Sequence, residues 1–235
     1  MKKIGIIIYA RTSSKRLPKK VLKIINKKPL IEIIYLRIKK KLKKIPIIIN
    51  TSKNKSDDQI IDFCKKKKIK YFRGSLKNVF KRTIECNKKF NLDGFVRVNA
   101  DRPYLDSDLI RTMINFYLKK SYDIVTNQFP KSCPKGLACE VASVKIFKKL
   151  NLKKLNTKDK EHIFNYFYKN SNNFKIYNYK DNFYYKKKRL NLSLDTKKDF
   201  SIAKEIYESD KINKIINLNT KKIIKRFNKL FYETK

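Results

Sequence analysis

Histidine and paired cysteines are scarce in this sequence. The chain has one histidine, His162, and four cysteines, none of which forms a CxxC pair. Such a set cannot complete a Cys/His zinc site, and thiols without a disulfide framework favour a reducing compartment. No apolar run approaches the roughly 20 residues that cross a bilayer, and no secretory signal pattern opens the chain. We therefore expect a cytoplasmic protein with no membrane span and no structural zinc.

Acidic residues are also few. There are 20 of them against 61 basic residues, which gives a formal net charge of +41 and suggests an anionic partner. Lysine supplies 51 of the basic residues and arginine only ten, beside abundant Ile and Asn, which is typical of an AT-rich coding sequence. Because arginine is the usual reader of bases and phosphates, this surplus indicates a solvated lysine surface more than specific nucleic-acid recognition.

One segment keeps the nucleic-acid alternative open. Aromatic residues at Tyr177, Tyr179 and 183–185 are followed by the basic run Lys186–Arg189. Aromatic rings beside a charged groove are typical of proteins that bind single strands. The part richest in Tyr and Lys, Lys180–Arg189, is otherwise expected to be an exposed excursion.

Internal repeats and Pro/Gly/Ser-rich linkers are missing, and 41% of the residues are hydrophobic, so we expect one packed domain. Strands are predicted at Ile4–Tyr9, Ile45–Asn50, Lys70–Phe72, Gly94–Asn99, Asp123–Thr126 and Glu140–Val144. Helices are predicted after Pro29 and at Asp57–Lys68 with Ser56 as N-cap, Lys77–Lys89, Asp106–Leu118, Lys160–Lys169 and Lys198–Glu208. This alternation predicts an α/β fold with a mostly parallel, Rossmann-like sheet flanked by helices.

The end of the chain has apolar residues at helical spacing, among them Ile215, Ile223 and Leu230. We expect a helical extension over residues 211–235 that packs on the domain or on another subunit, so a homodimer is possible.

The loop Arg11–Lys20 joins the first strand to the first helix and carries the densest chemical signal. It brings together Arg11, Lys15, Arg16 and Lys20 with three hydroxyl groups. Several cations and hydroxyl donors at the carboxyl end of a strand suit a triphosphate, although a merely basic surface loop would look similar. The loop lacks the GxxxxGK[ST] pattern of a P-loop.

Ordered motifs then resemble a known family. The loop resembles the ARxxSxRLPxK signature of cytidylyltransferases that activate acylneuraminate-type sugar acids, and of the related spore coat polysaccharide biosynthesis protein F group. Further similar blocks follow in the family's order, and together they cover about residues 4–208. They are Lys28–Leu30, Phe72–Ser75 with Val79–Arg82, Arg97–Pro103, Gly136–Val141, Glu161–His162 and Leu194–Thr196.

The resemblance implies a nucleotide-diphospho-sugar transferase type of fold, with residues 1–210 as the nucleotidyltransferase domain. It implies transfer of CMP from CTP to an acidic, acylneuraminate-like or keto-deoxy sugar, with pyrophosphate released, for surface polysaccharide or glycan biosynthesis. Asp101 and Asp195 would hold Mg²⁺, and each follows a predicted strand or strand-like run, where a sheet delivers carboxylates to a site. Arg11, Lys20 and Asp101 are the implied catalytic residues. The implied nucleotide-binding residues are Arg11, Ser14, Lys15, Arg16, Lys20, Arg73, Gly74, Ser75, Arg82 and Asn99.

Two departures from the spore coat group bear on the substrate. Lys19 stands where that group usually has Gly, and Ala138 where it usually has Asp. The second puts the sugar in doubt more than the reaction, so another nucleotide or a neutral sugar stays an alternative. His162 is either a structural residue or a contact to substrate. A catalytically silent subunit is the last alternative, and the presence of both Asp101 and Asp195 argues against it.

Overall fold

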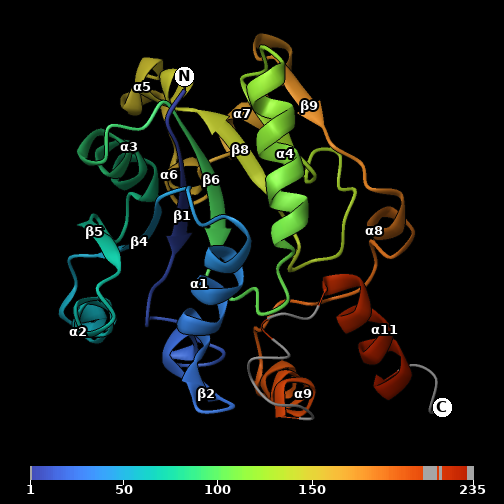
Figure 1. Ribbon diagram of the computed structural model, residues 1–235. Helices are drawn as coiled ribbons and strands as arrows, with labels where there is room; N and C mark the ends of the chain where they lie inside the picture. Colours follow the sequence, from blue (N-terminus) through green and yellow to red (C-terminus); the bar gives the residue numbers. More distant parts are fainter. Residues whose placement is uncertain (1, 209–215, 217–218, 232–235) are drawn as a thin grey trace.

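The computed structural model describes residues 2–208, 216 and 219–231. Its centre is a seven-stranded sheet in the order β5-β4-β1-β6-β8-β7-β9 (Figure 1). The strands are β1 Ile4–Tyr9, β4 Ile47–Ser52, β5 Lys70–Gly74, β6 Gly94–Asn99, β7 Ile124–Thr126, β8 Glu140–Ser143 and β9 Ile176–Asn178. A separate hairpin pairs β2 Ile24–Ile25 with β3 Lys28–Pro29.

The first four strands of the order are parallel to one another, as the alternating pattern predicted. β1 pairs in parallel with β4 and with β6, and β4 with β5. β8 runs antiparallel to both β6 and β7, whereas β9 is parallel to β7. The carboxyl ends of β1 and β6 therefore lie at one edge of the sheet, at adjacent positions Tyr9 and Asn99.

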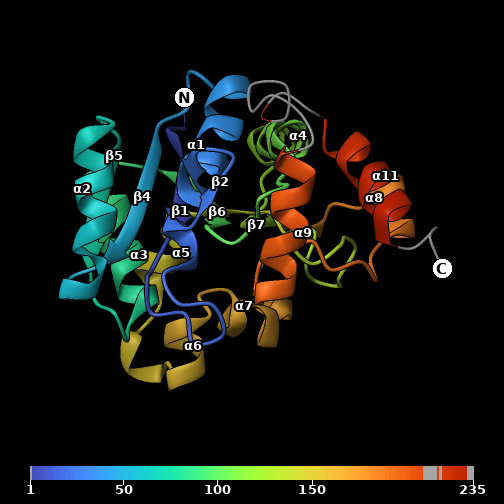
Figure 2. The same ribbon diagram turned by 90° about the horizontal axis from the view of Figure 1, so that it is seen from below.

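Helices cover both faces of the sheet (Figures 1 and 2). The larger helices are α1 Leu30–Lys41, α2 Asp58–Lys66, α3 Val79–Lys89, α4 Ser107–Lys119, α9 Lys197–Glu208 and α11 Thr220–Phe231. Alternate side chains of β1 enter opposite cores: Ile6 and Ile8 pack in the cluster that includes α1 and α4, whereas Ile7 packs in the cluster with α3. Burial on both faces explains why β1 reads as a continuous apolar run.

The helix caps differ from the predicted one. Ser56 is not a cap, because its own N–H donates to the side chain of Asn54, the N-cap of a 3-10 turn at Lys55–Asp57. α2 begins only after that turn, at Asp58. The intervening turn uses Asn54, an equally good capping residue, so the sequence alone could not choose between the two.

The second half is more broken than predicted. The helix predicted at Lys160–Lys169 is two short helices, α6 Thr157–Glu161 and α7 Asn165–Lys169, and the run 191–194 is not a strand but contributes one bridge, from Asn191 to Lys135. The remaining elements are α5 Val144–Lys149, α8 Asn182–Lys186 and 3-10 turns at Lys20–Leu22, Leu152–Lys154 and Ser171–Asn173.

Two segments near the end of the chain agree with the prediction only in part. The segment Lys180–Arg189 is not wholly exposed, because α8 buries Tyr184, whose hydroxyl hydrogen-bonds Asp106. At the end of the chain, α11 buries Ile223 and Ile224 in the main core cluster. Residues 211–215, 217–218 and 232–235 of the predicted extension, and the side chain of Leu230, lie outside the described part. Among the described residues no helix is long and apolar enough to cross a membrane.

Candidate active site

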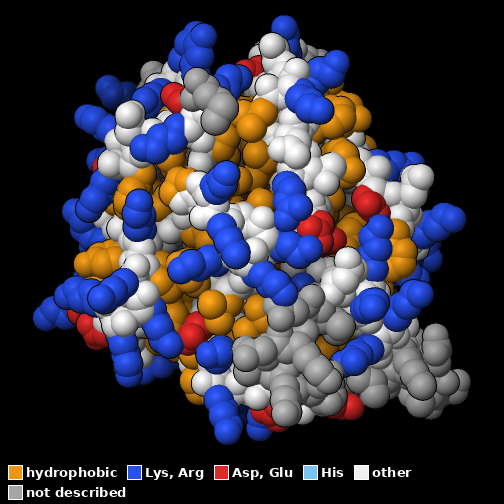
Figure 3. Space-filling model, in the orientation of Figure 1, with side chains coloured by type: hydrophobic (Ala, Val, Ile, Leu, Met, Phe, Trp, Pro, Cys, Tyr) orange, Lys and Arg blue, Asp and Glu red, His pale blue; other side chains and the backbone are white. Residues whose placement is uncertain are grey.

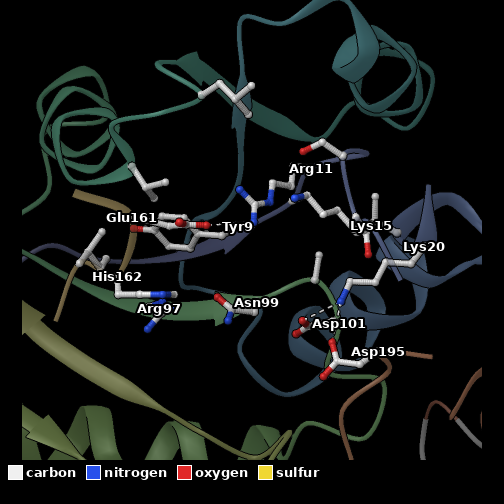
Figure 4. Close-up of a pocket in the computed structure, with 18 of the residues that line it drawn as sticks. Tyr9, Arg11, Lys15, Lys20, Arg97, Asn99, Asp101, Glu161, His162 and Asp195 are labelled. Atoms are coloured by element: carbon white, nitrogen blue, oxygen red, sulfur yellow. Dashed lines mark hydrogen bonds and ion pairs between the residues drawn. The ribbon is translucent and has the colours of Figure 1, made fainter. Parts of the chain in front are cut away.

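A cavity of about 760 Å³ opens where β1 and β6 end. The loop Arg11–Lys20, helix α3 and the break between α6 and α7 surround it. Its lining residues are Tyr9, Ala10, Arg11, Ser13–Arg16, Lys20, Val21, Leu76, Val79, Arg82, Arg97, Asn99–Asp101, Glu161–Ile163 and Asp195. Figure 4 shows the labelled side chains converging on this space.

The basic loop is held by one apolar residue within it and one directly after it. Leu17 and Val21 are each only 2% exposed, so they anchor the loop while Arg11, Lys15 and Arg16 stay exposed. Lys19 has φ +52°, the left-handed conformation that glycine adopts without steric cost. Lysine in place of glycine at this position therefore keeps the turn, but the left-handed backbone conformation costs conformational energy in a residue that has a Cβ.

Lys20 links the two aspartates that the sequence singled out. Its Nζ donates to Asp101 Oδ2 and to Asp195 Oδ1, both at 3.0 Å, and to the carbonyl of Leu194 at 3.1 Å (Figure 4). The Lys20 side chain is only 13% exposed. Residues 20, 101 and 195 thus meet at one point of the cavity, although they are far apart in the chain.

Asp195 is surrounded by cations. Besides Lys20, it accepts a hydrogen bond from Lys135 at 2.6 Å and pairs with Arg16 at 3.4 Å. Burial alone would raise the pKa of Asp195, but the hydrogen bonds from Lys135 and Lys20 outweigh it and hold the pKa well below its ordinary value. Lys135 was not predicted; its only sequence signal is that it precedes the Gly136 block.

The donor set fits a cation that is shared with a ligand. Within the described residues there is no group of three or more His, Cys, Asp or Glu that would hold a metal by itself. Asp101 and Asp195 already face one ammonium group together. Magnesium is usually bound by one or two carboxylates plus substrate phosphates, so this pair suits Mg²⁺ on a nucleotide better than a metal held by protein alone.

A buried polar network forms the other end of the cavity. Arg97 on β6 donates from Nη1 to Glu140 Oε2 at 2.9 Å, and Tyr168 donates to the second oxygen of the same carboxylate at 2.8 Å. Among the described residues this is the one hydrogen bond that Arg97 makes through its guanidinium group. Its remaining N–H groups are therefore available to a ligand. Nearby, burial raises the pKa of Tyr9 well above its ordinary value, so Tyr9 stays neutral.

Helix α6 and α3 supply the side walls. Arg11 and Glu161 pair at 3.1 Å across the opening, and both side chains are about half exposed. His162 follows directly and lines the cavity, so a role in substrate contact stays a prediction. Arg82 is 3% exposed, donates to the carbonyl of Ser75, and pairs with no carboxylate in the described part. Burial lowers the pKa of Arg82, which marks an incompletely compensated cation in the wall.

Most of the predicted residues come together, and a few do not. Arg11, Ser14, Lys15, Arg16, Lys20, Arg82, Asn99, Asp101 and Asp195 all line the cavity. Arg73, Gly74 and Ser75 do not line it. Arg73 instead donates to the carbonyls of Ser52 and Asn54. A Cβ on Gly74 would lie 2.5 Å from the Arg82 side chain, so this glycine makes room for Arg82. Ala138 also lies outside the lining, and its carbonyl accepts from Arg102.

Comparison with known proteins agrees with this geometry. A family model described as cytidylyltransferase matches residues 5–232. An uncharacterized protein of Methanocaldococcus jannaschii is 34% identical over 224 residues, which is 95% of this chain and 89% of that protein. Spore coat polysaccharide biosynthesis protein SpsF of Bacillus subtilis is 24% identical over 213 residues, or 88% of each chain.

Solved structures share the fold. A cytidylyltransferase from Leptospira borgpetersenii superposes with a TM-score of 0.89 at 24% identity, over 97% of this chain and 95% of the other. A CMP:2-keto-3-deoxy-manno-octonic acid synthetase in complex with CTP gives 0.67 at 13% identity, over 88% and 99%. The ordered motifs, the fold and the family match therefore agree that this chain is a nucleotidyltransferase belonging to the cytidylyltransferase family.

Proposed function

We propose that this enzyme transfers CMP from CTP to an acidic, acylneuraminate-like or keto-deoxy sugar, releases pyrophosphate, and serves surface polysaccharide or glycan biosynthesis. The observation that carries the proposal is the cavity in which the cationic loop Arg11–Lys20 faces the carboxylates of Asp101 and Asp195. The proposed compartment is the cytoplasm, which suits four free, buried thiols.

In the proposed reaction a sugar hydroxyl attacks the α-phosphorus of CTP, a new oxygen–phosphorus bond forms, and the bond to pyrophosphate breaks. Arg11, Lys15 and Arg16 would hold the triphosphate and neutralise the charge that develops on the leaving pyrophosphate. Asp101 and Asp195 would hold Mg²⁺, which supplies further charge neutralisation at the phosphates when bound. The chain contributes positioning and electrostatics rather than a covalent intermediate.

The acceptor end favours an anionic sugar. Arg97 lines the cavity, and in the described part of the chain Glu140 holds its guanidinium through one hydrogen bond, so its other N–H groups can meet a ligand. A fixed guanidinium recognises a carboxylate through paired hydrogen bonds, which a neutral sugar cannot match. A neutral acceptor would offer no anionic partner to the N–H groups of Arg97 that Glu140 does not engage.

Changing Arg97 to lysine should separate acceptor binding from nucleotide binding. Lysine keeps a positive charge beside the buried Glu140 but loses the planar fork. We expect KM for the acidic sugar to rise at least about tenfold while KM for CTP changes less than about twofold. Arg111→Lys on α4, an exposed position, is the matched control. An unchanged KM for the sugar in a folded Arg97→Lys enzyme would contradict this assignment.

The function itself is tested by pyrophosphate release. The enzyme should release pyrophosphate with CTP and Mg²⁺ in the presence of a keto-sugar acid, and should do so poorly with ATP, GTP or UTP and with neutral sugars. Turnover with another triphosphate or with a neutral sugar would identify the corresponding alternative. No turnover with any combination, together with no CTP binding, would contradict the enzymatic proposal.

The charged surface predicts how a nucleic-acid alternative would behave. Lys and Arg side chains are scattered over the face in Figure 3 rather than gathered in one band. The Nζ atoms of Lys180 and Lys188 lie 3.5 and 4.3 Å from the ring centroid of Tyr185, so lysines already contact this half-buried ring. We expect generic DNA or RNA binding to collapse as salt rises from about 50 to about 200 mM, because such contacts release counterions. CTP binding with Mg²⁺ should survive better, because its cations converge in a cavity.

Titration of both ligands at the two salt concentrations measures this difference. Salt-resistant, sequence-selective nucleic-acid binding without CTP binding would instead identify the aromatic- and lysine-rich segment Lys175–Arg189 as the functional site.

A further inference from the structure

Asp57 is a buried carboxylate outside the cavity whose hydrogen bonds lead to the basic loop. It is 1% exposed and is not among the lining residues. It stands at the N-cap position of α2, yet its side chain makes no capping hydrogen bond to that helix. An aspartate in this position normally caps the helix. The carboxylate of Asp57 is therefore committed to other groups.

Those groups belong to the ends of two strands. Asp57 Oδ1 accepts from the backbone N–H of Thr12 and from its hydroxyl, both at 2.8 Å. Asp57 Oδ2 accepts from the N–H of Ser52 at 3.3 Å and from the Ser52 hydroxyl. One carboxylate thus joins the exit of β1 to the exit of β4. Burial alone would raise the pKa of Asp57, but these hydrogen bonds outweigh it and lower the pKa below its ordinary value.

Thr12 in turn holds the loop together. Its carbonyl accepts from the N–H of Ser14 at 2.9 Å and from the N–H of Lys19 at 3.0 Å. The two bonds close the loop across the residues that carry the phosphate-facing side chains. Arg11, Ser14 and Lys20, which line the cavity, lie in or next to the part of the loop that these bonds hold.

We propose that Asp57 is a positioning residue for the nucleotide: through Thr12 it fixes the shape of the loop Arg11–Lys20 without touching the ligand. The inference rests on the proposed role of this loop in binding CTP. It requires a carboxylate, because Thr12 and Ser52 both present N–H donors to it. An asparagine has one acceptor oxygen and one donor group, so it would place its NH₂ against one of these N–H groups.

Asp57→Asn tests the proposal in the ligand-free protein by hydrogen exchange. We expect the amides of Ser14 and Lys19 to exchange at least about tenfold faster, because the bonds to the Thr12 carbonyl open more often. Asp62→Asn, an exposed change of the same kind on α2, is the matched control and should leave the loop unchanged. Unchanged exchange of the loop in Asp57→Asn would overturn the proposal.

Binding of CTP with Mg²⁺ gives the second readout. Asp57→Asn should raise Kd for CTP at least about tenfold and Asp62→Asn less than about twofold. Thr12→Val should raise Kd for CTP several-fold, whereas Thr12→Ser, which keeps the hydroxyl, should bind CTP like the unmodified enzyme. Thr112→Val on α4 is the control and should leave Kd unchanged. In the double variant Asp57→Asn/Thr12→Val, Kd should be close to that of Asp57→Asn alone, since both changes break one linkage.

The outcomes separate this inference from the proposed function. If the unmodified enzyme does not bind CTP, the proposed function fails, and exchange still decides whether Asp57 holds the loop. If the unmodified enzyme binds CTP and folded Asp57→Asn binds it equally well, only the positioning role is overturned. If Asp57→Asn does not fold, Thr12→Val replaces it as the test variant. The proposal is then overturned if the loop amides of Thr12→Val exchange at the same rate as those of Thr112→Val, or if the two variants bind CTP equally well.

Discussion

Replacing Asp101 with alanine should lower kcat at least about 100-fold in a protein that remains folded. Asp101 lies directly beyond β6, its side chain is 25% exposed, and its Oδ2 accepts from Lys20. Under the proposed mechanism the change removes one of two magnesium ligands, so charge on the reacting phosphates is no longer neutralised in the transition state. The fold should persist because Lys20 keeps its bonds to Asp195 and to the Leu194 carbonyl.

Asp62→Ala is the control for this change, because Asp62 is exposed on α2 and does not line the cavity. Circular dichroism and a thermal melt establish folding, and single-turnover rates with saturating CTP separate chemistry from binding. A folded Asp101→Ala enzyme with near-normal kcat would contradict the assignment of Asp101 as a metal ligand. A loss that excess Mg²⁺ or Mn²⁺ partly restores would support it.

The first half of the fold was predictable because each local signal agreed with the tertiary structure. The strands Ile4–Tyr9 and Gly94–Asn99 have the predicted bounds, and both are buried runs next to each other in the sheet. Parallel order followed from the alternation of strands and helices. That order alone placed Asp101 and the loop Arg11–Lys20 at the same edge.

Contacts between distant loops were not predictable. Lys135 reaches Asp195 only because the bridge between Lys135 and Asn191 joins two irregular segments. Gly136 allows that approach, since it has φ +98° and an added Cβ would lie 2.5 Å from the backbone of Leu192. A surface lysine in a lysine-rich chain carries no signal that distinguishes it from its neighbours. The pairing of Arg97 with Glu140 likewise depends on the register of two antiparallel strands.

Local sequence patterns gave a wrong prediction where tertiary packing decides where short helices begin and end. The sequence predicted one helix at Lys160–Lys169, but Ile163 and Phe164, which lie between α6 and α7, pack in the second core cluster. This break carries Glu161 and His162 to the cavity. The single predicted helix was therefore wrong at this break, where the lining residues Glu161 and His162 lie.

Lys20 should show effects of opposite sign on nucleotide and metal binding. Its ammonium group lies between Asp101 and Asp195, with 3.0 Å to an oxygen of each. Lys20→Met removes a charge-assisted contact to the triphosphate, so CTP affinity should fall by about 1.5 to 3 kcal/mol, or about 10- to 150-fold. The same change removes the cation that offsets two neighbouring carboxylates. In the ligand-free enzyme, affinity for a divalent cation should therefore rise.

Calorimetric titration of CTP, and of Mn²⁺ alone, measures the two effects on one preparation. Lys43→Met, an exposed change that removes the same charge, controls for the net charge of the protein. If Lys20 served only as a structural ion pair, its loss would weaken CTP and Mn²⁺ binding together, because the two carboxylates would repel each other and the site would open. If Lys20 shares the position that the cation takes beside the nucleotide, Mn²⁺ binding strengthens while CTP binding weakens. Parallel loss of both affinities would contradict the placement of the metal between Asp101 and Asp195.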